Sequence, residues 1–217
     1  VTRKNANYLE IAKKGSHSDA LESASAFADK GGTPWTVYGW FQLPNHPVAN
    51  APLFVGSKAS TTSWKVWVRR GTLNTVIVQL VDSDASGNKQ WTFDSSGKIT
   101  DDWFHLAIHH DGPNVADESV VVYVNGVALP QSGTPTETSW SGTPYLWAKL
   151  RLKSEDSSRF TWGVDEFGIH EGAFNDTLAQ ELYNSGKYLD IQTFSDKGNV
   201  FAHYSPGDST GTADTIV

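Results

Sequence analysis

Carboxyl groups that could perform hydrolysis gather in one segment. Asp165 and Glu166 are adjacent, and Glu171 follows five residues later. Retaining glycoside hydrolysis needs two carboxyl groups about 5–5.5 Å apart, and residues i and i+2 of a strand share a face. Asp165 and Glu166 are therefore expected on opposite faces of a strand, with Glu171 beyond its end. We keep glycoside hydrolysis as a minority alternative, assign no catalytic residue and expect a protein that is not an enzyme.

An acidic loop offers a second kind of chemistry. Asp82 and Asp84 open the stretch Asp-Ser-Asp-Ala-Ser-Gly, which matches the first half of a calcium-binding loop. The glutamate expected at the twelfth position is absent, because Phe93 stands there. Asp, Ser and Gly are also the residues that tight turns favour. A calcium ligand pair and a solvated hairpin turn are both open as interpretations.

The seven histidines raise the question of a zinc site. The closest set is His105, His109 and His110. On a strand, His105 and His109 share a face but lie about 13–14 Å apart, while His109 and His110 point in opposite directions. One metal ion does not span that arrangement, so zinc is not expected. The chain has no cysteine, which excludes disulfides and thiolate metal ligands.

A strand face that mixes an aromatic ring with polar groups is typical of glycan binding, because one side of a pyranose ring is apolar. In the segment 63–70, Trp67 shares its face with Lys65 and Arg69, while Trp64, Val66 and Val68 form the other face. Further residues on the polar side of their predicted strands are Gln79, His105, His109 and Tyr123. These seven residues are predicted to line one concave carbohydrate-binding face. The alternative is a merely amphipathic face, or one covered by the N-terminal segment or a partner.

Such residues need strands to position them, and the composition favours strands. The chain has 217 residues, 12% of them aromatic and only 19% charged. β-Branched and aromatic side chains pack well on a pleated sheet, and this length suits one large all-β domain. The net charge of −7 argues against a nucleic-acid partner, which calls for a basic surface. No apolar run approaches the roughly 20 residues that span a bilayer, so no membrane insertion is expected.

Alternation of apolar and polar residues predicts a series of strands joined by polar turns. The expected strands are 36–43, 53–58, 63–70, 75–81, 90–93, 103–109, 120–124, 145–152 and 161–170. Asn125-Gly126 is a strong hairpin signal. One helix is expected over 177–184, with Thr177 and Gln180 in capping-box spacing and Gly186 placed to end it. Strands of this length and spacing predict a two-sheet antiparallel sandwich.

Three segments in order carry a resemblance to a known family: DWFHLAIHHDG at 102–112, VVYVNGV at 121–127, and FTWGVDEFGIHEGAF at 160–174, followed by the helix. Together they resemble the laminin-G-like jelly-roll domains of the concanavalin A-like lectin/glucanase superfamily. The ELYNSGKYLD segment is also similar to such modules in phage and viral structural proteins and in bacterial adhesins. The resemblance implies an N-terminal arm or first strand (1–24), a jelly roll (25–188) and a partly packed C-terminal tail (189–217).

The resemblance also implies functions. In several jelly rolls of this superfamily an aspartate of the late strand helps to bind structural calcium, and Asp165 stands at that position. Glycan binding or adhesion on an exposed surface, such as that of a virion, is the first functional hypothesis. The second is an architectural capsid, decoration or surface-layer subunit that binds neighbouring proteins, as a homo- or hetero-oligomer. Both place the protein outside the cell or on a particle surface. A fold does not choose between such functions.

Overall fold

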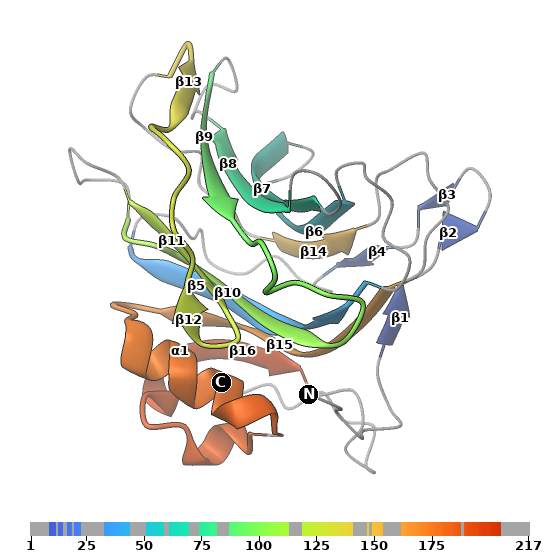
Figure 1. The fold of residues 1–217 in the computed structure, drawn as a ribbon, viewed down its shortest axis with the longest axis vertical. Coiled ribbons are helices and arrows are strands. Elements are labelled where there is room, and N and C mark those ends of the chain that lie inside the picture. Colours follow the sequence, from blue (N-terminus) through green and yellow to red (C-terminus); the bar gives the residue numbers. More distant parts are fainter. Residues whose placement is uncertain are drawn as a thin grey trace.

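The computed structural model describes most of the chain between residues 9 and 204. The described residues are 9–11, 13–14, 17–18, 20–22, 33–43, 51–58, 61–69, 74–81, 87–112, 119–140, 147, 149–153, 162–187 and 189–204. Within them, two antiparallel sheets lie face to face, and one short α-helix follows the late strands (Figure 1). The predicted all-β, two-sheet sandwich with a short helix near the C-terminal end is confirmed.

The first sheet, called here the β10 sheet, has seven strands. Six run in the order β1 (Leu9–Ile11), β15 (Trp162–Glu171), β5 (Trp35–Gln42), β10 (Phe104–His110), β11 (Val120–Val124) and β12 (Val127–Ala128). The seventh, β16 (Val200–Tyr204), pairs with the same edge of β15 that β1 occupies. The expected Asn125-Gly126 turn joins β11 to β12 with φ values of 52° and 74°, the left-handed region that this dipeptide tolerates.

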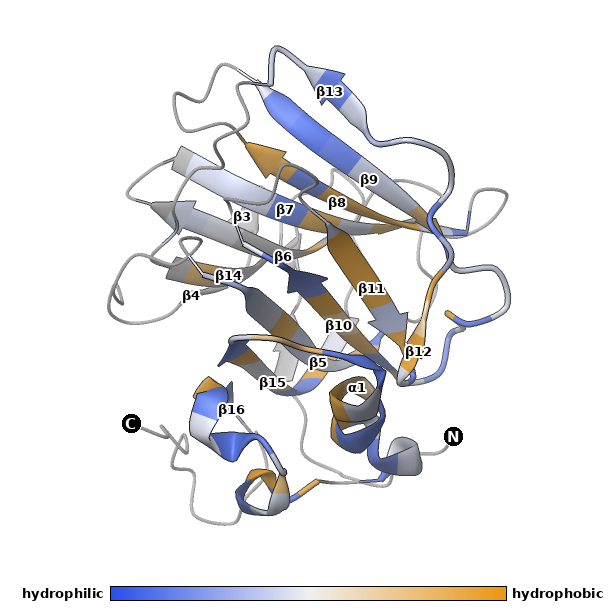
Figure 2. Cartoon of the chain, turned by 90° about the vertical axis from the view of Figure 1, so that its left-hand side faces the viewer, coloured by the Kyte–Doolittle hydropathy of each residue, from blue (hydrophilic) through white to orange (hydrophobic). Residues whose placement is uncertain are grey.

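The second sheet, called the β8 sheet, also has seven strands. Their order is β13 (Thr136–Thr138), β9 (Asn88–Asp94), β8 (Thr75–Val81), β7 (Thr61–Arg69), β6 (Ala51–Lys58), β14 (Lys149–Lys153) and β4 (Ala20–Glu22). Two short strands, β2 (Lys13–Lys14) and β3 (His17–Ser18), pair separately. In Figure 2 much of β9 and β13 is blue, which marks a polar edge of this sheet.

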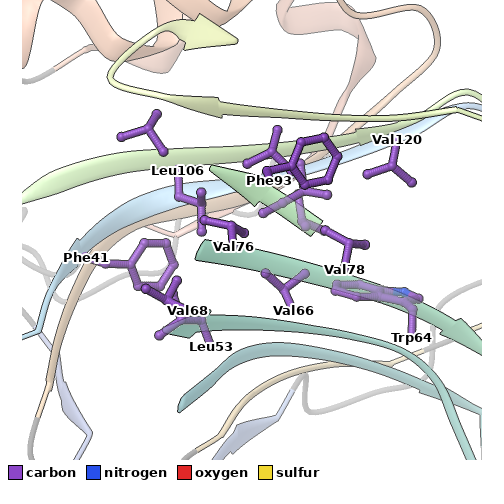
Figure 3. Packing of buried hydrophobic residues seen from close by; sticks show 14 of the residues in the cluster. Phe41, Leu53, Trp64, Val66, Val68, Val76, Val78, Phe93, Leu106 and Val120 are labelled. Carbon is purple, nitrogen blue, oxygen red and sulfur yellow. The ribbon is translucent and has the colours of Figure 1, made fainter. Parts of the chain in front are cut away.

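The inward-facing residues of the two sheets form one hydrophobic core. Val66, Val68, Val76 and Val78 of the β8 sheet meet the side chains of the β10 sheet, all fully buried (Figure 3). The alternation of apolar and polar residues in the segments 103–109, 120–124 and 161–170 predicts seven inward residues. Phe104, Leu106, Ile108, Val122, Val124 and Val164 are buried in this core, and Phe167 packs against them half-buried. Because each such side chain contributes about 1.5–3 kcal/mol when buried, this core is the main source of stability.

Helix α1 (Asp176–Tyr183) begins earlier than expected. Its N-cap is Asn175, whose side-chain Oδ1 accepts the N–H of Leu178 at 3.1 Å, so the predicted cap at Thr177 is wrong. Asn and Thr both cap helices, but Thr177 already lies within the first turn. The helix ends at Asn184 in the left-handed conformation (φ 45°), two residues before Gly186. Among the described residues, no helix has the length and apolar character needed to cross a membrane.

The segment after β15 covers the outer face of the β10 sheet. It contains α1 and the 3-10 turns η1 (Asn184–Gly186), η2 (Ile191–Thr193) and η3 (Lys197–Asn199), and we call residues 174–187 and 189–199 the C-terminal cover. Figure 1 shows it on the side of the β10 sheet that faces away from the β8 sheet. A second apolar cluster, formed by Tyr38, Ala107, Tyr123, Phe174, Ala179, Leu182, Ile191, Phe194 and Val200, joins the cover to the sheet.

Candidate functional site

Three of the predicted carbohydrate-binding residues lie beneath the C-terminal cover. His105 and His109 on β10 and Tyr123 on β11 have exposed fractions of only 1%, 7% and 3%. Lys65, Trp67 and Gln79 lie in the other sheet and are half-buried. The prediction that all seven residues line one face is therefore wrong. Alternation correctly separates the inside of the sandwich from the outside, but it does not say which sheet a strand joins or what covers that sheet.

The buried histidines hydrogen-bond to the elements around them. His109 Nδ1 lies 3.0 Å from Thr36 Oγ1, and His170 Nε2 lies 2.8 Å from the Asp196 carboxylate of the C-terminal cover. Burial lowers the pKa of His109, against the opposing influence of a backbone hydrogen bond and Asp111. Burial also raises the pKa of Tyr123 to about 12. These groups join the cover to the β10 sheet and are withdrawn from any ligand in solution.

The two adjacent carboxylates of β15 do not point to opposite faces as expected. Asp165 pairs with Trp40 and Gly168 with Tyr38, so β15 has one more residue than β5 between these pairs. Glu166 occupies this bulge in the left-handed region (φ 44°), and such an extra residue breaks the alternation. Asp165 shares a face with its partner Trp40, and Glu166 lines a cavity beside that same ring. Both carboxylates are therefore on the outer face, 2% and 3% exposed.

The cavity beside Glu166 is too small for a sugar. Its lining is Tyr38, Trp40, His105, Glu166, Leu182, Leu189, Ile191 and His203, and its volume is about 10 Å³. That volume suits about one water molecule. Tyr38 donates to or accepts from His203 Nδ1 at 3.1 Å, and the pKa of Tyr38 is raised by burial first and by the Glu166 charge second. A glycan chain has no access to these carboxylates beneath the C-terminal cover.

The calcium expectations stay predictions. Asp82 and Asp84 lie outside the described residues. Asp165 is buried in the β10 sheet, and no group of three or more His, Asp or Glu side chains in the described part of the chain is placed to bind a metal ion. Calcium needs several oxygen ligands.

The outer face of the β8 sheet carries the other predicted residues. Lys65 is opposite Gln79 in the register, and Trp67 is opposite Ile77. The Lys65 ammonium lies 5.8 Å from the centre of the Trp67 ring, within the range of a cation–π contact. Gln79 Nε2 donates to Asn88 Oδ1 at 3.1 Å. Position 69 at the end of β7 has the same parity as Trp67, and the Arg69 side chain lies outside the described part.

This second face remains partly open to solvent. Trp67, Lys65 and Gln79 are each half-buried, and the helices of the described chain lie on the far side of the β10 sheet (Figures 1 and 2). Ile77, which lies between Trp67 and Thr92 in the register, is only 2% exposed. The candidate site is therefore an aromatic ring, a cation and two fixed amides on an open sheet face, which we call the Trp67 face (Lys65, Trp67, Gln79 and Asn88).

Sequence reasoning missed the buried polar groups Tyr38, His170 and His203 and the half-buried Asp196. One signal for them was available: the helix has an apolar side, and residues 200–204 form an apolar patch. The apolar side of the helix and the apolar patch both need a surface to pack against. The outer face of a sheet supplies such a surface.

Two layers of antiparallel strands around one core define a β-sandwich. The chain belongs to the concanavalin A-like lectin/glucanase superfamily, whose laminin G model matches residues 14–178. This confirms the family resemblance drawn from the three sequence segments. No curated protein sequence matches the chain.

Solved structures with the same fold share little sequence with this chain. The binding domain of botulinum neurotoxin serotype D is 14% identical with a TM-score of 0.59, covering 85% of this chain and 43% of the toxin chain. A toxin DC binding domain in complex with SialylT is 12% identical with a TM-score of 0.61, covering 85% and 46%. The heptameric pentraxin of Limulus polyphemus is 12% identical with a TM-score of 0.58, covering 82% of both chains. The chain spans less than half of the toxin chains, and these likenesses establish the fold.

Proposed function

We propose that this protein is a non-catalytic recognition module that binds glycans on the Trp67 face, outside the cell or on a particle surface. The observation that carries the proposal is the half-buried Trp67 ring beside a lysine and an amide pair on an open sheet face. An aromatic ring stacks on the apolar side of a sugar, and planar polar groups bind its hydroxyls. The likeness to toxin binding domains and a pentraxin is consistent with this role.

The structure gives physical reasons to prefer binding over hydrolysis. The carboxylates that hydrolysis would use, Asp165 and Glu166, are buried under the C-terminal cover. Their cavity has room for about one water molecule. On the Trp67 face, in contrast, none of the four residues carries a carboxyl group. A hydrolase needs two such groups flanking the bond that it cleaves.

A glycan array probed with the whole chain tests the proposal. We expect specific hits, and we expect Trp67→Leu to weaken them at least about tenfold, or about 1.4 kcal/mol. Leucine keeps an apolar cover over Ile77 but removes the aromatic face, so the urea unfolding midpoint should change little. Trp67→Phe should retain most of the binding. Repeating the array with a chelator tests the calcium expectation separately.

The matched control is Val127→Ala, at an exposed residue (49%) of β12 in the other sheet, which should leave all hits unchanged. If Trp67→Leu does not weaken the glycan hits, the glycan-binding site lies elsewhere than on the Trp67 face. An array without hits, together with binding to a protein from the same particle or cell surface, would favour the architectural alternative.

A further inference from the structure

In the described part of the chain, Lys65 forms no ion pair with an acidic side chain, and its ammonium lies 5.8 Å from the centre of the Trp67 ring. Two carboxylates on the neighbouring strands β9 and β13 have partners of their own: Glu137 pairs with Lys89 at 3.2 Å, and Asp94 accepts the N–H of Ser96 at 2.9 Å. The positive charge of Lys65 is therefore available on the Trp67 face.

The positive charge on the Trp67 face contrasts with the acidic composition of the chain. Acidic residues outnumber Lys and Arg by 24 to 17, for a net charge of −7. On the outward positions of β7, β8 and β9 the described residues include Lys65 and one carboxylate, Asp94. Asp94 is opposite Thr75 in the register, at the other end of β8 from Gln79. A positive site on an acidic protein attracts anions locally and is complementary to a negatively charged ligand.

We infer that the ligand of the Trp67 face is an acidic glycan, one whose sugar carries a carboxylate or sulfate group. This inference rests on the proposed function and specifies its ligand class. A sugar ring stacked on Trp67 places its anionic substituent within reach of the Lys65 ammonium, because the two side chains are already in contact. Gln79 lies opposite Lys65, and its bond to Asn88 fixes both amides beside the charge.

The charge of the ligand matters because of what happens to Lys65 on binding. A neutral sugar bound on Trp67 would displace water from the Lys65 ammonium and replace it with a neutral hydrogen bond. A carboxylate or sulfate returns a charge-assisted hydrogen bond, which is shorter and stronger. Acidic glycans should therefore be selected over neutral ones by at least about tenfold.

Titration calorimetry with matched sugar pairs tests the inference on the whole chain. The probes are an oligosaccharide with and without its terminal sialic acid, and a hexuronic acid oligosaccharide beside its methyl ester. We expect at least about tenfold tighter binding of one or both acidic members, weakened by raising NaCl from 50 to 300 mM. Lys65→Gln should remove that preference and leave the affinity for the neutral member unchanged.

The matched control is Lys187→Gln, at an exposed lysine in the C-terminal cover, which should retain the preference. Acidic and neutral members that bind equally, both lost in Trp67→Leu, would overturn the acidic ligand and leave the proposed function standing. Equal weakening by Lys65→Gln and Lys187→Gln would overturn it by showing attraction to net charge alone. Binding of no glycan would overturn both the acidic ligand and the proposed function.

Discussion

Replacing Gly56 with alanine is expected to destabilise the protein by about 3 kcal/mol or more. Gly56 on β6 pairs with Trp64 on β7, and an added Cβ would lie 1.9 Å from Trp64 Nε1 and 2.3 Å from Cε2. The indole ring cannot yield easily, because it is 1% exposed, stacks on Trp35 at 4.9 Å and meets the edge of Trp147 at 5.2 Å. Overpacking of such a core costs about 1–3 kcal/mol and occasionally more.

Urea unfolding of the variant and two companions measures this effect. Gly198→Ala is the control, since no atom lies within 4 Å of its added Cβ, and it should stay within about 0.5 kcal/mol of the wild type. The double variant Gly56→Ala with Trp64→Leu should cost less than the sum of its parts, because the collision is removed. A Gly56→Ala protein as stable as the wild type would show that the Trp64 ring can move aside.

Acidification between pH 6.5 and pH 4 is expected to remove on the order of 3 kcal/mol of stability through His110. Burial lowers the pKa of His110 from 6.5 to about 4, and His109 and Lys89 act in the same direction while Asp111 opposes them. His110 Nδ1 accepts the N–H of Gly112 at 3.2 Å, and its ring stacks on Trp35 at 5.4 Å. A proton on Nδ1 would face that N–H donor, so the folded protein keeps the ring neutral.

The direction of the pH effect follows from the lowered pKa. The unfolded chain binds a proton at His110 near pH 6.5, whereas the folded chain binds it only near pH 4. Between these values the unfolded state holds more protons, so stability falls as the pH falls through this window. The lowered pKa of His109 adds to the loss in the same direction.

The measurement compares the wild type with His110→Phe, which keeps an aromatic ring against Trp35 and cannot titrate. Urea unfolding at pH 7.5, 6.5, 5.5 and 4.5 gives the free energy of unfolding of each protein. Acidic residues titrate in both proteins, so the difference between the two curves isolates His110. We expect that difference to shift in favour of His110→Phe as the pH falls. Parallel curves would show that His110 is protonated equally in the folded and unfolded states.

The strands of the core were predictable because their period-two pattern is strong. The segments 36–43, 63–70, 75–81 and 103–109 correspond to β5, β7, β8 and β10 with boundaries within one or two residues. Their inward residues are predominantly apolar, with His110 at the end of β10 as a polar exception, and burial of one face fixes the register. The Asn125-Gly126 turn was predictable for a different reason, since few other dipeptides tolerate its backbone angles.

The candidate site was predictable only in part. The alternation of β7 correctly separated Trp67 and Lys65 from the core. It could not say that His105 and Tyr123 belong to another sheet, because strand partnership depends on contacts between distant segments. The bulge at Glu166 also could not be predicted from the sequence. Glutamate does not favour positive φ, so nothing local marked the residue that moves Asp165 and Glu166 onto one face.

The pairing of β1 and β16 with one edge of β15 has a consequence for how the protein reaches its fold. Leu9–Ile11 pair with residues 162–164 of β15, and residues 200–204 pair with residues 167–170. That edge is closed by segments separated by almost the whole described chain. Such long-range pairing slows folding, and an unpaired edge is a template for association with other chains. During synthesis β1 is already available when β15 emerges, but residues 167–170 of the same edge stay unpaired until β16 has been made. In that interval this half of the edge is a template for association with other chains.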